Sequence, residues 1–261
     1  MGVVNVTPDS FSDGGKYRSL EAAIAHGRQM IGEGADIIDV GGESTRPGAD
    51  PVAAVDELAR VLPVVGALAA DGIAVSIDTT KPEVAHAALD AGAAVVNDVT
   101  GLANPAMLEA VAGSVAGVVI MHMQGEPRTM QENPQYADVV AEVRDFLLKR
   151  AESAEAAGIA AERIAIDPGI GFGKTFDHNL ALLRNLQLLV ETGYPVLLGA
   201  SRKAFLGRIL GGSVPAAERD PATGATVALA IEQGVAVVRV HNVAMTAQIA
   251  RTVEAILGRS K

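Results

Sequence analysis

Eight short apolar runs recur along this chain, and each is followed by a stretch with the periodicity of an amphipathic helix. Seven of the runs stop at a polar residue of a kind that binds or catalyses: Asn5, Asp39, Asp78, Asn97, His122, Asp167 and His241. The eighth run, at 196–198, leads through Gly199 into Ser201-Arg202-Lys203. Fully apolar runs that alternate with helical pattern are typical of parallel strands buried on both faces. The chain is therefore predicted to be an α/β protein with a parallel sheet.

The regular alternation of apolar runs and helical stretches predicts a (β/α)8 TIM barrel. Eight βα units in 261 residues match that fold, whose active groups lie at the C-terminal ends of the strands because the βα loops converge there. A doubly wound open sheet also alternates strands and helices, but it gathers its ligand groups at one switch point instead of at every strand end. Because the βα pattern continues without a shift in composition, we predict a single domain over residues 1–261.

Composition excludes several classes of function. The formal net charge of −10 opposes binding to nucleic acid, and with 3% aromatic residues the chain lacks stacking platforms for single strands. It contains no Cys, which excludes disulfides and fits a reducing compartment. No segment resembles a signal peptide or is long enough to span a bilayer, so we expect a cytoplasmic protein without a membrane partner. An anionic substrate would need local cations, and Arg46, Arg202, Lys203 and Arg239 lie beside strand ends.

Helical patterns and connecting segments alternate with these apolar runs along the chain. Helical patterns are expected at 20–33, 51–70, 81–91, 105–112, 136–157, 177–192, 204–209, 221–233 and 243–257. Several are followed by a Gly, a common helix C-cap, namely Gly34, Gly72, Gly92, Gly158, Gly193 and Gly234. Long connections at 7–19, 41–50 and 124–135 follow strand ends directly, and such loops over a barrel mouth tend to be lids or binding loops.

The Gly-rich segment 169–175 resembles a phosphate-binding loop but does not match one. That motif needs four residues between its first Gly and the Gly-Lys pair, and Pro168 occupies the place of the first Gly. The spacing of the glycines does not fit a dinucleotide-binding fingerprint either. We therefore expect a tight turn after Asp167 that displays Phe172.

Asp78, Asn97 and Asp167 end three strands that reach the same mouth, so they are candidates for one shared ligand. A carboxylate that accepts two parallel N–H bonds makes a strong, planar contact, which suits an aminopyrimidine edge such as that of a pterin. The alternative is that such residues only cap helices, with Asp78 before Thr79-Thr80 and Asp98 before Thr100. Convergence of all three on one mouth favours the binding interpretation.

Arg239 and His241 alternate with Val240 and should point to the same side of the last strand. Together with Asn5 from the first strand, they are candidates for binding a phosphate-type anion. The alternative is a buried His satisfied by backbone and an Arg paired with a barrel carboxylate. His122 lies between Met121 and Met123, where packing and function are both open. Zinc is not expected, since the remaining His residues lack ligand spacing and there is no Cys.

Seven segments, in order along the whole chain, closely resemble the signatures of the dihydropteroate synthase family. They are Met1 to Gly15, Asp39 to Pro47, Ser76 to Thr79, Asn97-Asp98, Asp167 to Lys174, Ser201 to Lys203, and Arg239 to His241. The last two separate this family from other pterin-binding barrels. The resemblance implies a folate-pathway transferase that joins 6-hydroxymethyl-7,8-dihydropterin diphosphate to 4-aminobenzoate and releases pyrophosphate in a Mg2+-assisted step. It also implies a homodimer.

The resemblance also implies roles for individual residues. The pterin pocket would contain Asp78, Asn97, Met121, Asp167, Gly199 and Lys203. The diphosphate and metal site would contain Asn5, as the metal ligand, with Thr45, Arg239 and His241. The walls of the 4-aminobenzoate pocket, where sulfonamides compete in this family, would be Thr45, Arg46, Pro47, Phe172, Ser201 and Lys203. Lys203, Arg239 and His241 would act in catalysis, and Asp13 would stabilise a cationic pterin after early loss of pyrophosphate.

Two departures from the family pattern give further expectations. Family members usually carry a segment before the Met-Gly signature, so the first strand is expected to be less well anchored here. Asn242 follows His241 where Asp is frequent, and we expect little effect beyond a weaker metal shell. A pterin-dependent methyltransferase barrel has no use for a diphosphate site, so 201–203 and 239–241 disfavour it. A non-catalytic pterin-binding paralogue should have lost Asp13, Arg46 or Lys203, all of which are present.

Overall fold

The structure, a computed structural model, describes residues 1–6, 15–44, 49–212 and 214–259, with the side chains of 15–19 outside that description. Within these residues eight strands follow one another, separated by helices. The strands are β1 Gly2–Asn5, β2 Ile37–Gly41, β3 Ala74–Asp78, β4 Val95–Asp98, β5 Gly117–Met121, β6 Ile164–Asp167, β7 Leu197–Leu198 and β8 Val237–Val238. Each lies on one of the apolar runs of the sequence, so the predicted strands are confirmed.

The strands close into a ring. Strands β1 to β6 form one parallel sheet in chain order, and β7 pairs in parallel with β8. Parallel bridges at Ile166–Val196 and Gly2–Val240 join the two sheets on both sides. Backbone hydrogen bonds between Val3 and Val240 (3.2 Å) and between Val240 and Met1 (3.0 Å) hold β1 against the last strand as well as against β2. The predicted (β/α)8 barrel is confirmed, and the expected weak anchoring of β1 is not observed.

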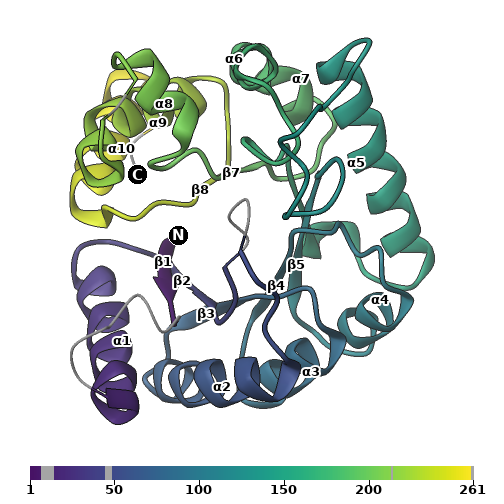
Figure 1. Cartoon of the computed structure of the whole chain (residues 1–261), viewed down its shortest axis with the longest axis vertical. Coiled ribbons are helices and arrows are strands. Elements are labelled where there is room, and N and C mark those ends of the chain that lie inside the picture. The colour runs from purple at the N-terminus through teal and green to yellow at the C-terminus, as the bar shows by residue number, and fades with distance from the viewer. Residues whose placement is uncertain (7–14, 45–48, 213, 260–261) are drawn as a thin grey trace.

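The helices lie on the outside of this ring (Figure 1). They are α1 Gly15–Gly32, α2 Ala54–Ala70, α3 Pro82–Asp90, α4 Pro105–Ala112, α5 Val139–Ala156, α6 Phe176–Arg184, α7 Leu186–Val190, α8 Ala204–Ile209, α9 Asp220–Glu232 and α10 Val243–Ile256. All six predicted glycine stops adopt positive φ, from 77° at Gly72 to 105° at Gly34. This left-handed conformation ends a helix at little cost only where the residue has no Cβ.

Helix α1 begins five residues before the predicted start and α2 three residues after it, and two further differences have a local cause. The helix expected over 177–192 is divided into α6 and α7 at Asn185, whose backbone (φ −122°, ψ 26°) is not helical and whose side chain donates to the carbonyl of Ala181. The helix expected from residue 136 begins only at Val139. The reason is Asp138, whose carboxylate accepts from the N–H groups of Val140 and Ala141 and so caps the helix there.

Much of the core lies between the outer face of the barrel and the helices. Ile38, Ile77, Ile120 and Ile166, from β2, β3, β5 and β6, are fully buried. Three of them directly precede Asp39, Asp78 and Asp167, and Ile120 is paired with Ile166, so strand alternation turns all four toward the helices and the aspartates toward the barrel interior. No helix among the described residues is long and apolar enough to cross a membrane.

Candidate active site

The register of the sheet brings the predicted pterin-binding residues to one edge. Gly41 is paired with Asp78, and Asp78 with Asn97, so the ends of β2, β3 and β4 are level. Further round, Met121 is paired with Asp167 at the ends of β5 and β6. Because all these strands are parallel, the side chains at their C-terminal ends face the same mouth.

Arg239 lies at the centre of this group. Its Nε donates to Asp39 Oδ2 (2.6 Å) and its Nη2 donates to Asp78 Oδ2 (2.7 Å). The amide of Asn97 also donates to Asp39 Oδ2, at 3.3 Å. The two carboxylates raise the pKa of Arg239 further above its usual range, against the effect of burial. The structure thus shows the pairing with barrel carboxylates that the sequence left as an alternative, and among the described residues nothing accepts from Arg239 Nη1.

Asp39 and Asp78 share the single guanidinium of Arg239, and this shared contact affects the pKa of Asp78. Burial raises the pKa of Asp78 to about 7; Arg239 opposes the shift and the charge of Asp39 adds to it. Asp78 is therefore only partly ionised near neutral pH, where an isolated Asp would be fully ionised. The candidate alternative that Asp78 caps the next helix is wrong, because Lys81 occupies the cap position of α3.

Asp167 and Lys203 face each other on the other side of the mouth. Burial raises the pKa of Asp167, and the charge of Lys203 opposes that shift. Burial likewise lowers the pKa of Lys203 to about 8, while Asp167 opposes it. Lys203 donates to the carbonyl of Ile170, and its Nζ lies 4.4 Å from the centre of the Phe172 ring. Gly199 lies beside this carboxylate, since a Cβ there would be 3.8 Å from Asp167 Oδ2, an ordinary van der Waals contact.

Ser201 and His241 meet where β7 and β8 end. Ser201 Oγ lies 2.9 Å from His241 Nδ1, and the backbone N–H of His241 donates to the same hydroxyl at 3.2 Å. Sequence reasoning assigned these residues to two different subsites. Their contact joins the predicted 4-aminobenzoate wall to the predicted diphosphate site.

Arg202 and Asn242 have roles other than those considered from the sequence. Arg202, with φ of 59°, turns away to form a bidentate ion pair with Asp220 (2.7 and 2.8 Å), so it is not a free cation for an anionic substrate. Asn242 accepts from the N–H of Met245 as the cap of α10 and donates to Asp220 at 2.9 Å. An Asp at 242 would place a second carboxylate against Asp220, which explains why Asn suits this chain.

His122 is a packing residue with a polar contact. It is buried, its ring makes an edge contact with Phe146 at 4.9 Å, and its Nδ1 lies 2.9 Å from Lys174 Nζ. Burial lowers the pKa of His122 to about 3, so its ring is neutral at physiological pH. Asp98 is also engaged locally, accepting from Thr100 and from the N–H of Leu102. These are bonds within a turn, and the cap of the next helix, α4, is Asn104, so the helix-cap interpretation is wrong for Asp98.

Sequence reasoning missed three polar groups near the mouth. Asp39 was noted only as a strand end, although a fully buried charge within an apolar run is itself a signal of a paired site. Lys174 was not considered as a site residue, because the Gly-rich segment that contains it does not match a phosphate-binding loop. The third group is Lys81, which joins Glu43 and the fully buried Glu57; only the fold brings these three together.

Five predicted residues remain to be placed. Asp13, Thr45, Arg46 and Pro47 lie outside the described residues. Asn5 is half-buried at the end of β1, level with Gly41 at the end of β2. Its carboxamide oxygen is a ligand type that Mg2+ accepts.

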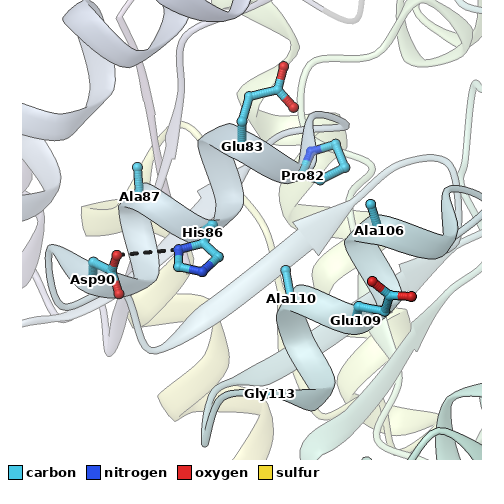
Figure 2. A pocket seen from close by; sticks show the side chains of 9 residues that line it. All are labelled: Pro82, Glu83, His86, Ala87, Asp90, Ala106, Glu109, Ala110 and Gly113. Carbon is cyan, nitrogen blue, oxygen red and sulfur yellow. Dashed lines mark ion pairs between the residues drawn. The ribbon is translucent and has the colours of Figure 1, made fainter.

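An open groove of about 660 Å³ lies away from this mouth, on the outer surface between α3 and α4 (Figure 2). Three alanines, Ala87, Ala106 and Ala110, line it, with Glu83 and Glu109 beside them. His86 forms an ion-pair contact with Asp90 across one turn of α3, at 3.3 Å. The groove contains none of the predicted site residues.

Comparison with known proteins agrees with the geometry of the mouth. A family model described as pterin binding enzyme matches residues 1–241. The dihydropteroate synthase of Escherichia coli strain K12 is 47% identical over 258 residues, which cover 98% of this chain and 91% of that protein. The Mycobacterium leprae enzyme is 51% identical over 263 residues, covering 98% and 93%.

Solved structures give the same result. Xanthomonas albilineans dihydropteroate synthase with 4-aminobenzoic acid superposes with a TM-score of 0.93 at 48% identity, covering 98% of this chain and 92% of that one. The Yersinia pestis enzyme in a sulfonamide drug complex has a TM-score of 0.93 at 43% identity, covering 99% and 94%. The chain therefore belongs to the pterin-binding enzymes and, among them, to the dihydropteroate synthases, the transferases of folate biosynthesis.

Proposed function

We propose that this chain joins 6-hydroxymethyl-7,8-dihydropterin diphosphate to 4-aminobenzoate at the barrel mouth, with release of pyrophosphate. The observation that carries the proposal is the contact of Arg239 with both Asp39 and Asp78, which sets a cation for the diphosphate beside carboxylates for the pterin. Relatives have been solved with the substrate and product of this reaction, 4-aminobenzoic acid and 7,8-dihydropteroate, in Xanthomonas albilineans. Burkholderia cenocepacia dihydropteroate synthase has also been solved with 7,8-dihydropteroate.

The pterin would lie between Asp78 on one side of the mouth and Asp167 on the other. Asp78, Asn97 and Asp167 supply acceptors for the N–H groups of its aminopyrimidine edge, and Lys203 supplies a donor for its carbonyl. Met121 and Gly199 would line the flat faces, since one is apolar and the other leaves space. Asp39 would keep Arg239 in place, because its carboxylate is fully buried and accepts from Arg239 at 2.6 Å.

The diphosphate would lie at the rim, held by Asn5, Thr45, Arg239 and His241. No group of three His, Cys, Asp or Glu that could hold a metal occurs in the described part of the chain. Mg2+ commonly binds through substrate phosphates, waters and one or two protein oxygens, so Asn5 with the diphosphate fits this ion. When bound, Mg2+ would neutralise charge on the departing pyrophosphate. Arg239 and His241 would stabilise the same oxygens from the protein side.

The aryl amine would enter last, between Thr45, Arg46, Pro47, Phe172, Ser201 and Lys203. The bond from the pterin methylene to the diphosphate oxygen breaks first, and its electron pair leaves with pyrophosphate. Positive charge is then delocalised into the pterin, where Asp13 would stabilise it. The neutral amine attacks the methylene and afterwards loses a proton, so no strong base is required beforehand. The same pocket is the expected site of sulfonamides, one of which is bound in the Yersinia pestis relative.

Replacing Lys203 by Ala tests the pocket assignment. We expect kcat/KM in a pyrophosphate-release assay to fall roughly 10- to 100-fold, the value of a hydrogen bond that involves a charged group. Lys149, which is exposed on α5, gives the matched control, and Lys149→Ala should retain parental activity. Unchanged activity in Lys203→Ala would refute the assignment. An inactive parent protein would instead favour a paralogue that only binds pterin.

The raised pKa of Asp78 predicts that pterin binds with release of a proton. A pterin N–H needs an ionised acceptor, so pterin affinity should increase as the pH rises towards about 7 and level off above it. Calorimetry in two buffers of different ionisation enthalpy should show proton release at pH 6 and little at pH 8.5. Asp78→Asn should abolish the pH dependence and weaken binding. The same proton release in the mutant would assign the effect to another group.

Three further properties complete the proposal. We expect one domain over residues 1–261, a homodimer in solution and a cytoplasmic location. The first is supported by the continuous ring of strands, in which β1 is bonded to the last strand. Sedimentation of the purified chain would measure its oligomeric state directly.

A further inference from the structure

Lys174 is a buried cation that the proposed reaction does not use. Its side chain is almost completely buried, at 2% exposure, on the turn between β6 and α6. Its Nζ lies 2.9 Å from His122 Nδ1 and donates to the carbonyls of Phe172 (3.0 Å) and His122 (3.3 Å). A lysine ammonium has three donors, and here three neutral acceptors surround it. These bonds offset part of the cost of burial, which still lowers the pKa of Lys174 well below its usual range.

His122 is fitted to accept one of these bonds. Because burial lowers the pKa of His122 to about 3, its ring carries one proton at physiological pH. Donation from Lys174 to Nδ1 then requires that the ring proton be on Nε2. The pair therefore joins the end of β5 to the β6–α6 turn.

The turn is pressed against the backbone that follows β5. A Cβ on Gly169 would lie 1.9 Å from the carbonyl oxygen of His122, and a Cβ on Gly173 would lie 2.2 Å from that of Gln124. Both glycines also have φ near 60°, a conformation that other residues rarely adopt. The two loops are in close contact at these points, and Lys174 bonds to both of them.

Phe172 contacts two lysines, Lys174 through its backbone and Lys203 through its ring. Its backbone carbonyl accepts from Lys174, while its ring faces the Lys203 ammonium, 4.4 Å from Nζ to the ring centre. The backbone of Phe172 is also bonded to Gly169 within the turn, at 3.0 Å. Lys174 thus holds the backbone of Phe172, and the ring of Phe172 contacts Lys203, a proposed substrate-binding residue.

We propose that Lys174 is a positioning residue that, together with His122, holds the Phe172 ring at the correct place to form the wall for the aryl-amine substrate. The inference rests on the proposed function for the identity of that substrate. The pterin side should depend on it less, because the Asp167 carboxylate accepts a hydrogen bond from the N–H of Gly169 at 2.7 Å and receives none from Lys174.

Lys174→Met keeps the length of the side chain and removes its three donors. We expect the KM for 4-aminobenzoate to rise roughly tenfold, as small misplacements of binding groups do, and the KM for pterin diphosphate to change less than twofold. Lys149→Met is the matched control and should leave both constants unchanged. Equal increases in both KM values, or no increase for 4-aminobenzoate, would overturn the proposal.

A second pair of variants tests the same contact if Lys174→Met folds poorly. His122→Asn retains an acceptor for Lys174 and His122→Leu does not, and both side chains branch at Cγ. The Leu variant should reproduce the selective rise in KM, and the Asn variant should stay close to the parent. Equal behaviour of the two would contradict a role for the bond to Lys174.

Fluorine NMR of protein labelled with fluorophenylalanine gives a measurement that does not depend on activity. The chain has five Phe, so the Phe172 resonance can be assigned by Phe172→Leu. His122→Leu should shift and broaden it, and His122→Asn should not. An unperturbed resonance would overturn the positioning role, whereas an inactive parent with the expected NMR change would overturn only the proposed function.

Discussion

Arg239→Met is expected to reduce kcat/KM by roughly a thousandfold, the largest effect on activity among the substitutions considered, because oxyanion-stabilising groups commonly contribute that much. The guanidinium is the group that contacts two barrel carboxylates and retains Nη1 for a ligand. Without it, the departing pyrophosphate would lose a cation, and the Asp39 and Asp78 carboxylates would lose their shared partner. Pyrophosphate release under saturating Mg2+ measures the first effect.

The same substitution should also destabilise the fold, by about 2–3 kcal/mol. This is somewhat less than the loss of a partner from a completely buried pair, because the Arg239 side chain keeps 23% exposure. The pKa of Asp78, already raised to about 7, should rise further without Arg239. A raised pKa in the folded state favours stability at low pH, so the mutant's free energy of unfolding should decrease as the pH rises from about 4 through neutrality.

A double variant separates the two effects. Arg239→Met with Asp78→Asn removes a buried charge together with its partner, so part of the stability should return while activity does not. Arg184→Met, on the exposed side of α6, is the matched control and should change neither. Activity within tenfold of the parent in Arg239→Met would contradict the assignment of this residue to the diphosphate.

Lys81→Met is expected to lower the free energy of unfolding by about 2–3 kcal/mol, somewhat less than the loss of a partner from a completely buried ion pair because the Lys81 side chain keeps 20% exposure. Lys81 lies 2.6 Å from Glu57 Oε2 and also bonds to Glu43. The Glu57 carboxylate is fully buried, and its other oxygen has no partner among the described residues. Its charge would therefore be left uncompensated. Urea unfolding of the parent and the mutant measures the difference.

Two controls make this prediction specific. Lys149→Met removes an exposed lysine and should change stability by less than about 0.5 kcal/mol. Lys81→Met combined with Glu57→Leu should recover most of the loss, because apolar side chains often replace a buried ion pair at little cost. A single mutant as stable as the parent would contradict the role of Lys81 as the stabilising partner of Glu57.

The cluster of Lys81, Glu43 and Glu57 also stabilises the chain that follows β2. One oxygen of Glu43 bonds to Lys81, and the other accepts from the N–H of Val52 at 2.9 Å. Arg60 donates to the carbonyl of Gly42, and a Cβ on Gly42 would meet Val61 at 2.8 Å. The two ends of the segment after β2 are thereby held against α2.

The fold could be predicted from the sequence because its signals are local. An apolar run that ends at a polar residue, followed by an amphipathic stretch and a glycine, specifies a βα unit from its own residues. Eight repeats at this length leave few alternatives. The strand ends at Asp78, Asn97 and Asp167 were placed correctly at one mouth for the same reason. Helix boundaries were less accurate where a single cap, such as Asp138, determined the first residue.

The sequence by itself determined the order of strands and helices, the family signatures and the set of polar residues at the mouth. The tertiary structure alone decided which of them pair: Arg239 with Asp39, 200 positions away, Ser201 with His241, and Lys174 with His122. The physical reason is that strand and helix patterns depend on neighbours along the chain. The partner of a buried charge depends on where ring closure places residues that are remote in the sequence.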